Sequence, residues 1–110
     1  MVSGFEEREK GYEAKWAHDE DLRFRALTRR NKLLGGWAAG CIGLQGPAAE
    51  SYTNLLLDME VRGAREEDFV RKIHEDFAAR NIAYSEHFIR RKIDEFASLA
   101  TQQIMNESKA

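Results

Sequence analysis

Few side chains in this sequence are spaced for catalysis or metal binding. His74 and Glu75 are adjacent, but the second histidine of an H-E-x-x-H zinc motif does not follow them. His18 lies beside Asp19 and near Asp21 in one short stretch, where no second element converges to complete a metal site. None of the serines lies in a nucleophile-elbow pattern. The sequence therefore predicts a protein that is not an enzyme, has no metal site and carries its histidines on the surface.

Five glycines within residues 35–46 invite comparison with a phosphate-binding loop. No Lys-Ser or Lys-Thr pair follows them and no strand pattern precedes them, so this signal is weak. Because Gly36 and Gly40 are four residues apart, a small-residue groove for close helix packing is the simpler interpretation. Gly43 and Gly46 fit equally well as the curvature of a loop before Pro47.

A run of basic residues precedes the glycines and could be read as a nucleic-acid surface. The run comprises Arg23, Arg25, Arg29, Arg30 and Lys32. The acids at positions 19–21 are close enough to pair with its first members, and the formal net charge of the chain is −2. We therefore expect no nucleic-acid binding, and favour a solvated helical face or a surface that docks onto an acidic protein.

Composition limits the architecture to one small helical unit. The chain has 110 residues, 43% of them hydrophobic, with one proline and eight glycines. Such a chain can bury one modest core, and the scarcity of turn residues favours an all-α fold. The single cysteine, Cys41, excludes an internal disulfide and has apolar neighbours, so we expect a buried structural thiol.

Membrane insertion and export are both disfavoured by the pattern. The first ten residues contain acids where a secretory signal would carry a basic end and an apolar run. The longest apolar stretch, residues 33–44, is shorter than the roughly 20 residues of a spanning helix. We expect a cytoplasmic protein.

Three helices are predicted after the glycine cluster. Pro47 favours a helix start, so a helix should run over residues 47–62 and stop at Gly63. Acids at positions 66–68 favour the next start, with Asn81 as a left-handed stop. Ser85 is a good N-cap for the last helix, whose polar tail from Asn106 should fray. The expected buried stripes are Tyr52, Leu55, Leu56 and Met59; Phe69, Val70, Ile73 and Phe77; and Ile89, Ile93, Phe96, Ala97, Ala100 and Ile104.

Before Gly46 the pattern predicts one long helical zone, from about Phe5 to Leu44, with an interrupted apolar stripe. At about 100° per residue, Phe5, Tyr12 and Trp16 share one face, but Glu20 and Arg23 then occupy it before it becomes apolar again. Either the helix kinks near residues 18–21, or the first segment is a separate arm. Packing of the three aromatics on the core is the plainer alternative.

Five sequence blocks together resemble a known family. They are A-H-D-E-D (Ala17–Asp21), R-R-N-K-L-L-G (Arg29–Gly35), W-A-A (Trp37–Ala39), D-F-V-R-K-I (Asp68–Ile73) and S-E-x-x-I-R-x-K (Ser85–Lys92). On these blocks the chain resembles the ζ subunits of alphaproteobacterial ATP synthases, small helical proteins that inhibit ATP hydrolysis by the catalytic head. The resemblance spans nearly the whole chain.

The resemblance implies a four-helix bundle, residues 18–110, with a mobile inhibitory arm, residues 1–17. In the family the arm becomes helical and enters the cleft between an α/β catalytic pair and the γ stalk, where it blocks rotation in the hydrolytic direction. By position, residues 18–21 would be the joint, with Asp19 as a helix cap. The residues implied in partner binding are Phe5, Arg8, Glu9, Tyr12, Lys15 and Trp16 in the arm, and Arg29, Arg30 and Lys32 in the body.

The resemblance also implies the partners and the setting. The partners are the α, β and γ subunits of the catalytic head, without direct membrane insertion, and the place is the cytoplasmic side of the inner membrane. We expect a monomer when free and no resident cofactor. Weak ATP or ADP binding is associated with the family, which leaves a second hypothesis of a nucleotide-responsive module with little inhibitory activity. The sequence contains no motif that locates such a site.

Overall fold

The computed structural model describes residues 19–108, which form four α-helices and no strands. The helices are α2 (Glu20–Cys41), α3 (Gly46–Val61), α4 (Glu66–Ala78) and α5 (Glu86–Ser108). The predicted all-α class is confirmed, and the last three helices lie within a residue or two of their predicted starts.

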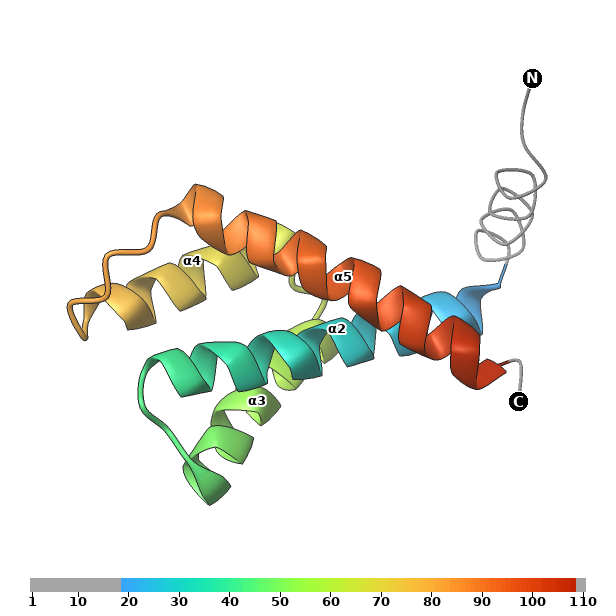
Figure 1. Cartoon of the computed structure of the whole chain (residues 1–110), viewed down its shortest axis with the longest axis horizontal. Coiled ribbons are helices and arrows are strands. Elements are labelled where there is room, and N and C mark those ends of the chain that lie inside the picture. The colour runs from blue at the N-terminus through green and yellow to red at the C-terminus, as the bar shows by residue number, and fades with distance from the viewer. Residues whose placement is uncertain (1–18, 109–110) are drawn as a thin grey trace.

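The long helices α2 and α5 lie against each other, with α3 packed on α2 and α4 packed on α5 (Figure 1). The α2–α3 and α4–α5 turns lie at one end of the molecule (Figure 1). At the other end, the start of α2 and the end of α5 continue side by side beyond α3 and α4 (Figure 1). The position where residues 1–18 join the bundle is therefore an exposed two-helix end.

The core is apolar and draws on all four helices. Its buried members are Leu34, Ala38, Ala39, Tyr52, Leu56, Phe69, Val70, Ile73, Phe77, Ile89 and Ile93. The predicted stripe of α4 is buried throughout, as are four of the six residues predicted for α5. In α3 the prediction was wrong for Leu55, which is 52% exposed because it lines an open surface groove beside α4.

The helix boundaries follow the local signals in the sequence. Asn81 and Gly63 adopt the left-handed conformation that ends a helix, with φ of 61° and 85°. The Phe88 amide donates to Ser85 Oγ at 3.0 Å, which caps α5 as predicted. Arg65 N donates to the Asp68 carboxylate at 2.8 Å, which ties the first turn of α4.

The predicted helical zone from Phe5 to Leu44 is not continuous. Asp19 is extended, with φ −107° and ψ 95°, and its Oδ1 accepts the Leu22 amide at 3.1 Å. Asp19 is thus the N-cap of α2, as the resemblance implied, and the helix begins at Glu20 and ends at Cys41. The arm and its aromatic residues lie outside the described residues.

One prediction about a helix end and one about the glycines need correction. The tail does not fray at Asn106, because α5 continues to Ser108, whose hydroxyl donates to the Ile104 carbonyl at 2.8 Å. Gly36 and Gly40 do not form a packing groove, since a Cβ at either position would meet nothing within 4 Å. The close approach is at Gly35, where a Cβ would lie 2.9 Å from the Cα of Thr53. Gly43 and Gly46 do shape the loop, with φ of 82° and 53°.

Cys41 packs against the core as predicted, although it is half-buried rather than buried. Burial nevertheless raises the pKa of the thiol, with Lys92 opposing the shift by its charge. The thiol is therefore kept neutral and poorly nucleophilic, as expected of a structural cysteine.

Candidate functional site

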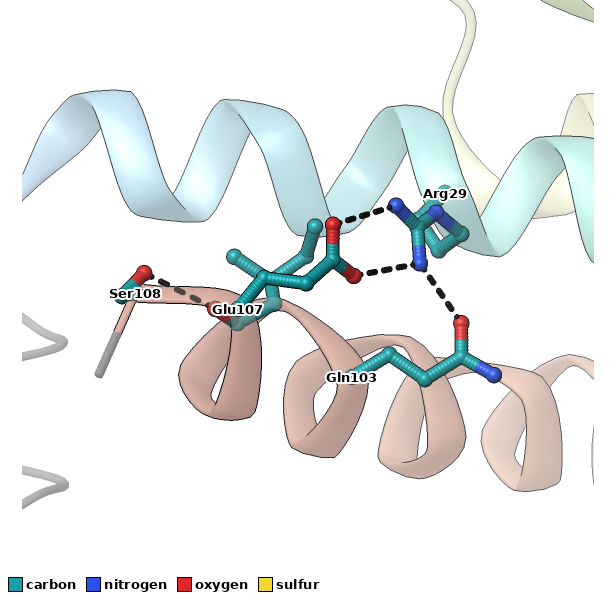
Figure 2. Close-up of polar contacts among 5 residues, drawn as sticks. Arg29, Gln103, Glu107 and Ser108 are labelled. Atoms are coloured by element: carbon teal, nitrogen blue, oxygen red, sulfur yellow. Dashed lines mark hydrogen bonds and ion pairs between the residues drawn. The ribbon is translucent and has the colours of Figure 1, made fainter. Parts of the chain in front are cut away.

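The residues of the R-R-N-K-L-L-G block point from α2 to three different helices. Arg29 binds the end of α5: one terminal nitrogen donates to Gln103 Oε1 and Glu107 Oε2, both at 2.8 Å, and the other donates to Glu107 Oε1 at 3.0 Å (Figure 2). This paired geometry matches the two guanidinium nitrogens to the two carboxylate oxygens. The Arg29 interaction therefore links α2 to α5 near the two-helix end of the molecule.

The Arg29 interaction shifts both partners toward their charged forms. The hydrogen bond from Arg29 lowers the pKa of the Glu107 carboxyl, and the hydrogen bond to Glu107 raises the pKa of Arg29. Glu107 is solvent-exposed, so water and salt screen this pair.

Arg30 lies against α4. Its guanidinium carbon is 5.4 Å from the centre of the Phe69 ring, and its Nε and one terminal nitrogen donate to Asn31 Oδ1 at 3.1 and 2.9 Å. Burial lowers the pKa of Arg30, while the charges of Glu66, Glu60 and Asp94 oppose that shift. Arg30 is therefore a structural cation that spans the α2–α4 contact.

Asn31 is the buried centre of the block and binds α3. Its side chain is fully buried, and Nδ2 donates to Glu60 Oε1 at 2.7 Å. Thr28 Oγ1 donates to the second oxygen of Glu60 at 2.8 Å. Asn31 and Glu60 were missed by the sequence analysis, although Asn31 sits in register with Leu27, Leu34 and Ala38, at helical spacing on one face.

The W-A-A block is also a packing element. Ala38 and Ala39 are fully buried, and the Trp37 ring meets the Phe77 ring edge-on at 5.5 Å. Lys92 Nζ lies 5.8 Å from the Trp37 ring centre and also approaches Phe88 and Phe96. The block therefore joins α2 to α4 and α5 through aromatic contacts.

Lys32 and Arg25 differ from Arg29 and Arg30 because their side chains form no hydrogen bond to another side chain of residues 19–108. Both are exposed, and within residues 19–108 neither forms an ion pair. They line a groove at the two-helix end together with Phe24, Thr28, Arg29 and Ile104. We call this the basic groove. Arg23 pairs only loosely with Glu20, at 3.9 Å.

Only three of the nine predicted partner-binding residues lie in the part of the chain that the structure describes. Phe5, Arg8, Glu9, Tyr12, Lys15 and Trp16 lie outside the described residues, and their role remains a prediction. Arg29 and Arg30 already have intramolecular partners, whereas Lys32 is exposed. Docking by these three residues also remains a prediction.

Residues 19–108 bring together no group of three side chains that could hold a metal ion. None of their helices is both long enough and apolar enough to cross a bilayer. Side-chain hydrogen bonds in this part of the chain link α2 to both α3 and α5.

A comparison with protein-family models identifies the family of this chain. The family described as ATPase inhibitor subunit zeta matches residues 1–103. The chain belongs to this family. Membership in the zeta family makes the chain an ATPase inhibitor subunit, a regulatory protein that associates with an ATP synthase. The zeta match includes residues 1–18 as well as the bundle, and no curated protein matches the chain.

Proposed function

We propose that this zeta subunit inhibits ATP hydrolysis by inserting residues 1–17 as a helical arm at the α/β/γ interface of the catalytic head. Phe5, Tyr12 and Trp16 are its apolar anchors, and Arg8, Glu9 and Lys15 form polar contacts around them. The bundle holds the arm at the head, with Lys32 as the exposed basic contact. Arm insertion blocks rotation in the hydrolytic direction.

The observation that carries the proposal is the break at Asp19. Its extended backbone marks the start of α2, directly after an arm whose three aromatics would share one face of a helix. The family blocks that lie in residues 19–108 are occupied by contacts within the bundle, through Arg29, Asn31 and Trp37. Inhibition is therefore assigned to the part of the match upstream of α2.

Energetics require the arm to use more than its aromatics. Full burial contributes about 1.5–3 kcal/mol for each large apolar side chain. Ordering the backbone costs about 1–2 kcal/mol per residue. Polar contacts by Arg8, Glu9 and Lys15 and helical hydrogen bonds must supply the difference. A cleft that closes during hydrolysis and opens during synthesis then gives one-way inhibition, because only the closed cleft retains the arm.

Deletion of residues 1–17 tests the assignment. The truncated protein keeps Asp19 as the cap of α2, so we expect an unchanged circular dichroism spectrum per bundle residue and no inhibition of ATP hydrolysis by the isolated head. A triple substitution, Phe5→Ala, Tyr12→Ala and Trp16→Ala, should reproduce the loss in the full-length chain.

Substitution of Leu55 by Ala provides the matched control, since Leu55 is an exposed apolar residue outside the arm. It should leave inhibition unchanged. Equal inhibition by the truncated and intact proteins would show that the bundle, rather than the arm, acts on the head.

A further inference from the structure

An open groove lies between α3 and the end of α4, beside the α2–α3 turn (Figure 1). Its apolar lining comes from Ile42 and Leu44 in the turn, Leu55 of α3 and Ala79 at the end of α4. Leu55 is 52% exposed there, and Ile42 and Leu44 are half-buried. We call it the α3–α4 groove. Its volume of about 380 Å³ falls in the range of small-molecule sites, so it has room for the apolar part of a ligand.

The carboxylate that lines this groove, Asp76, is already bound by two side chains. The Tyr52 hydroxyl donates to Asp76 Oδ2 at 2.7 Å, and Lys72 Nζ lies 3.2 Å from the same oxygen. The Lys72 ammonium is also 5.4 Å from the centre of the Tyr52 ring. These contacts tie α3 to α4 and compensate the charge of Asp76, which therefore repels an incoming anion only weakly.

Arg80 is the cation of the lining that has no such partner among residues 19–108. Its side chain is exposed and forms no ion pair within that part of the chain. Burial raises the pKa of Tyr52, and the charge of Arg80 opposes that shift, so the guanidinium lies within electrostatic reach of the groove. A guanidinium presents paired donors that match the two oxygens of a carboxylate. The groove thus combines an apolar floor with one receptor for an anion.

This combination favours a small ligand over a docked helix. A helix that binds in a groove inserts apolar anchors along several turns, and an acidic helix needs a row of cations beside them. The lining of the α3–α4 groove offers one unpaired cation, and its apolar residues gather around the α2–α3 turn. A single carboxylate on a short hydrocarbon body complements both features.

We propose that the α3–α4 groove binds a small apolar carboxylate, with its hydrocarbon part on Ile42, Leu44 and Leu55 and its carboxylate paired with Arg80. The groove lies at the far end of α2 from Asp19, where the arm begins. The 22 residues of α2 separate the two by about 33 Å at 1.5 Å per residue. A ligand in the groove leaves Asp19 uncovered, so the inference goes beyond the proposed function and does not depend on it.

Methyl and amide NMR of the full-length chain, titrated with sodium octanoate, tests the site. Saturable shifts should appear at Ile42, Leu44, Leu55 and Ala79, with half-saturation at about 1–10 mM for a ligand of about ten non-hydrogen atoms. Two further probes separate the parts of the ligand. Acetate carries the charge without the chain and should not saturate in this range. Octanamide carries the chain without the charge and should bind about fivefold more weakly than octanoate.

Substitutions in the groove separate its two parts in the same way. Arg80→Gln should weaken octanoate binding about fivefold, the loss expected for an exposed ion pair, and leave octanamide binding unchanged. Leu55→Ala should weaken both ligands, whereas it should leave inhibition of the catalytic head unchanged. The matched control is Arg91→Gln, which removes an exposed arginine of α5 and should leave octanoate binding intact.

Equal octanoate binding by the parent protein and Arg80→Gln would overturn the proposal. Shifts centred on the basic groove around Lys32 would also overturn it, because they would show attraction to any exposed cation. Shifts at Leu55 that grow with protein concentration in the absence of octanoate would assign the groove to a second copy of the chain. A parent protein that binds octanoate but fails to inhibit the catalytic head would remove the proposed function alone.

Discussion

The Asn31 side chain of α2 donates a hydrogen bond to Glu60 of α3 at 2.7 Å from a fully buried position. The same amide accepts two hydrogen bonds from Arg30, whose guanidinium covers Phe69 of α4. One side chain therefore links three helices through groups that all have partners. A fully satisfied polar centre of this kind fixes the register of helices that apolar packing alone leaves free to slide.

Replacing Asn31 by Ala should destabilise the bundle by about 2–3 kcal/mol. The substitution leaves a Glu60 oxygen and the Arg30 guanidinium without a buried partner, and unpaired polar groups cost more than the hydrogen bond contributes. For a domain of this size the melting temperature should fall by about 10 °C or more, measured by circular dichroism.

Asn54→Ala gives the control, because Asn54 is an exposed asparagine on the neighbouring helix. Its stability should stay within about 0.5 kcal/mol of the parent. Similar stabilities for both variants would show that the buried network is dispensable.

Three glycines of α2 should respond to alanine in opposite directions. At Gly35 a new Cβ would lie 2.8 Å from Thr53 Oγ1 and 2.9 Å from its Cα, so α3 must move, at a cost of about 1–3 kcal/mol. At Gly36 and Gly40 the space is open, and alanine should stabilise the helix by about 0.5–1 kcal/mol. Urea unfolding of the three variants gives the comparison, and a stabilised Gly35→Ala would contradict the close packing of α2 and α3.

The helix boundaries could be predicted because their signals are local. Pro47, Gly63, Asn81 and Ser85 each act within one turn of chain, and each lies where the sequence placed it. The stripe of α4 was equally clear, because its apolar residues repeat at helical spacing within a single element.

The interactions of the R-R-N-K-L-L-G block could not be predicted, because their partners are distant in the sequence. Arg29 finds Glu107 across 78 positions, and Asn31 finds Glu60 across 29. Such partners depend on how helices pair in space, which the sequence of α2 alone does not encode. The sequence therefore predicted a docking surface for the arginines, which remains a prediction, but it did not indicate their contacts within the bundle or the buried Asn31.

The Arg29–Glu107 pair should make the end of α5 sensitive to acid. The pKa of the Glu107 carboxyl is lowered in the folded protein. The stabilisation that the pair gives is therefore present above the ordinary glutamate pKa and is lost as the pH falls through the lowered value. We expect faster amide hydrogen exchange in the last turn of α5 at low pH. Glu107→Gln should show that faster exchange at neutral pH and no further acid response from this pair.

The matched control is Glu95→Gln, which removes an exposed carboxylate whose ion-pair partner within residues 19–108 is Lys92 on its own helix. It should leave exchange at the end of α5 unchanged. An acid response that survives in Glu107→Gln would assign the effect to another carboxylate.

Tyr52 should give the protein a characteristic loss of stability in alkali. Its hydroxyl donates to Asp76 Oδ2 at 2.7 Å, and Lys72 Nζ lies 3.2 Å from the same oxygen. Burial, followed by the hydrogen bond to Asp76, raises the pKa of Tyr52 above its ordinary value of 10.0.

The direction of the pH effect follows from that raised pKa. Above about pH 10 the unfolded chain releases the phenol proton while the folded protein retains it, so the free energy of unfolding falls as the pH rises. Tyr52→Phe removes the hydrogen bond and should cost about 1 kcal/mol at neutral pH. The substitution should also reduce the fall in the free energy of unfolding between pH 10 and 11, measured by urea unfolding at each pH. Tyr84→Phe is the control, because Tyr84 is 40% exposed and its ring contact with Phe88 survives the substitution. An equally steep alkaline decline in Tyr52→Phe would place the responsible group elsewhere.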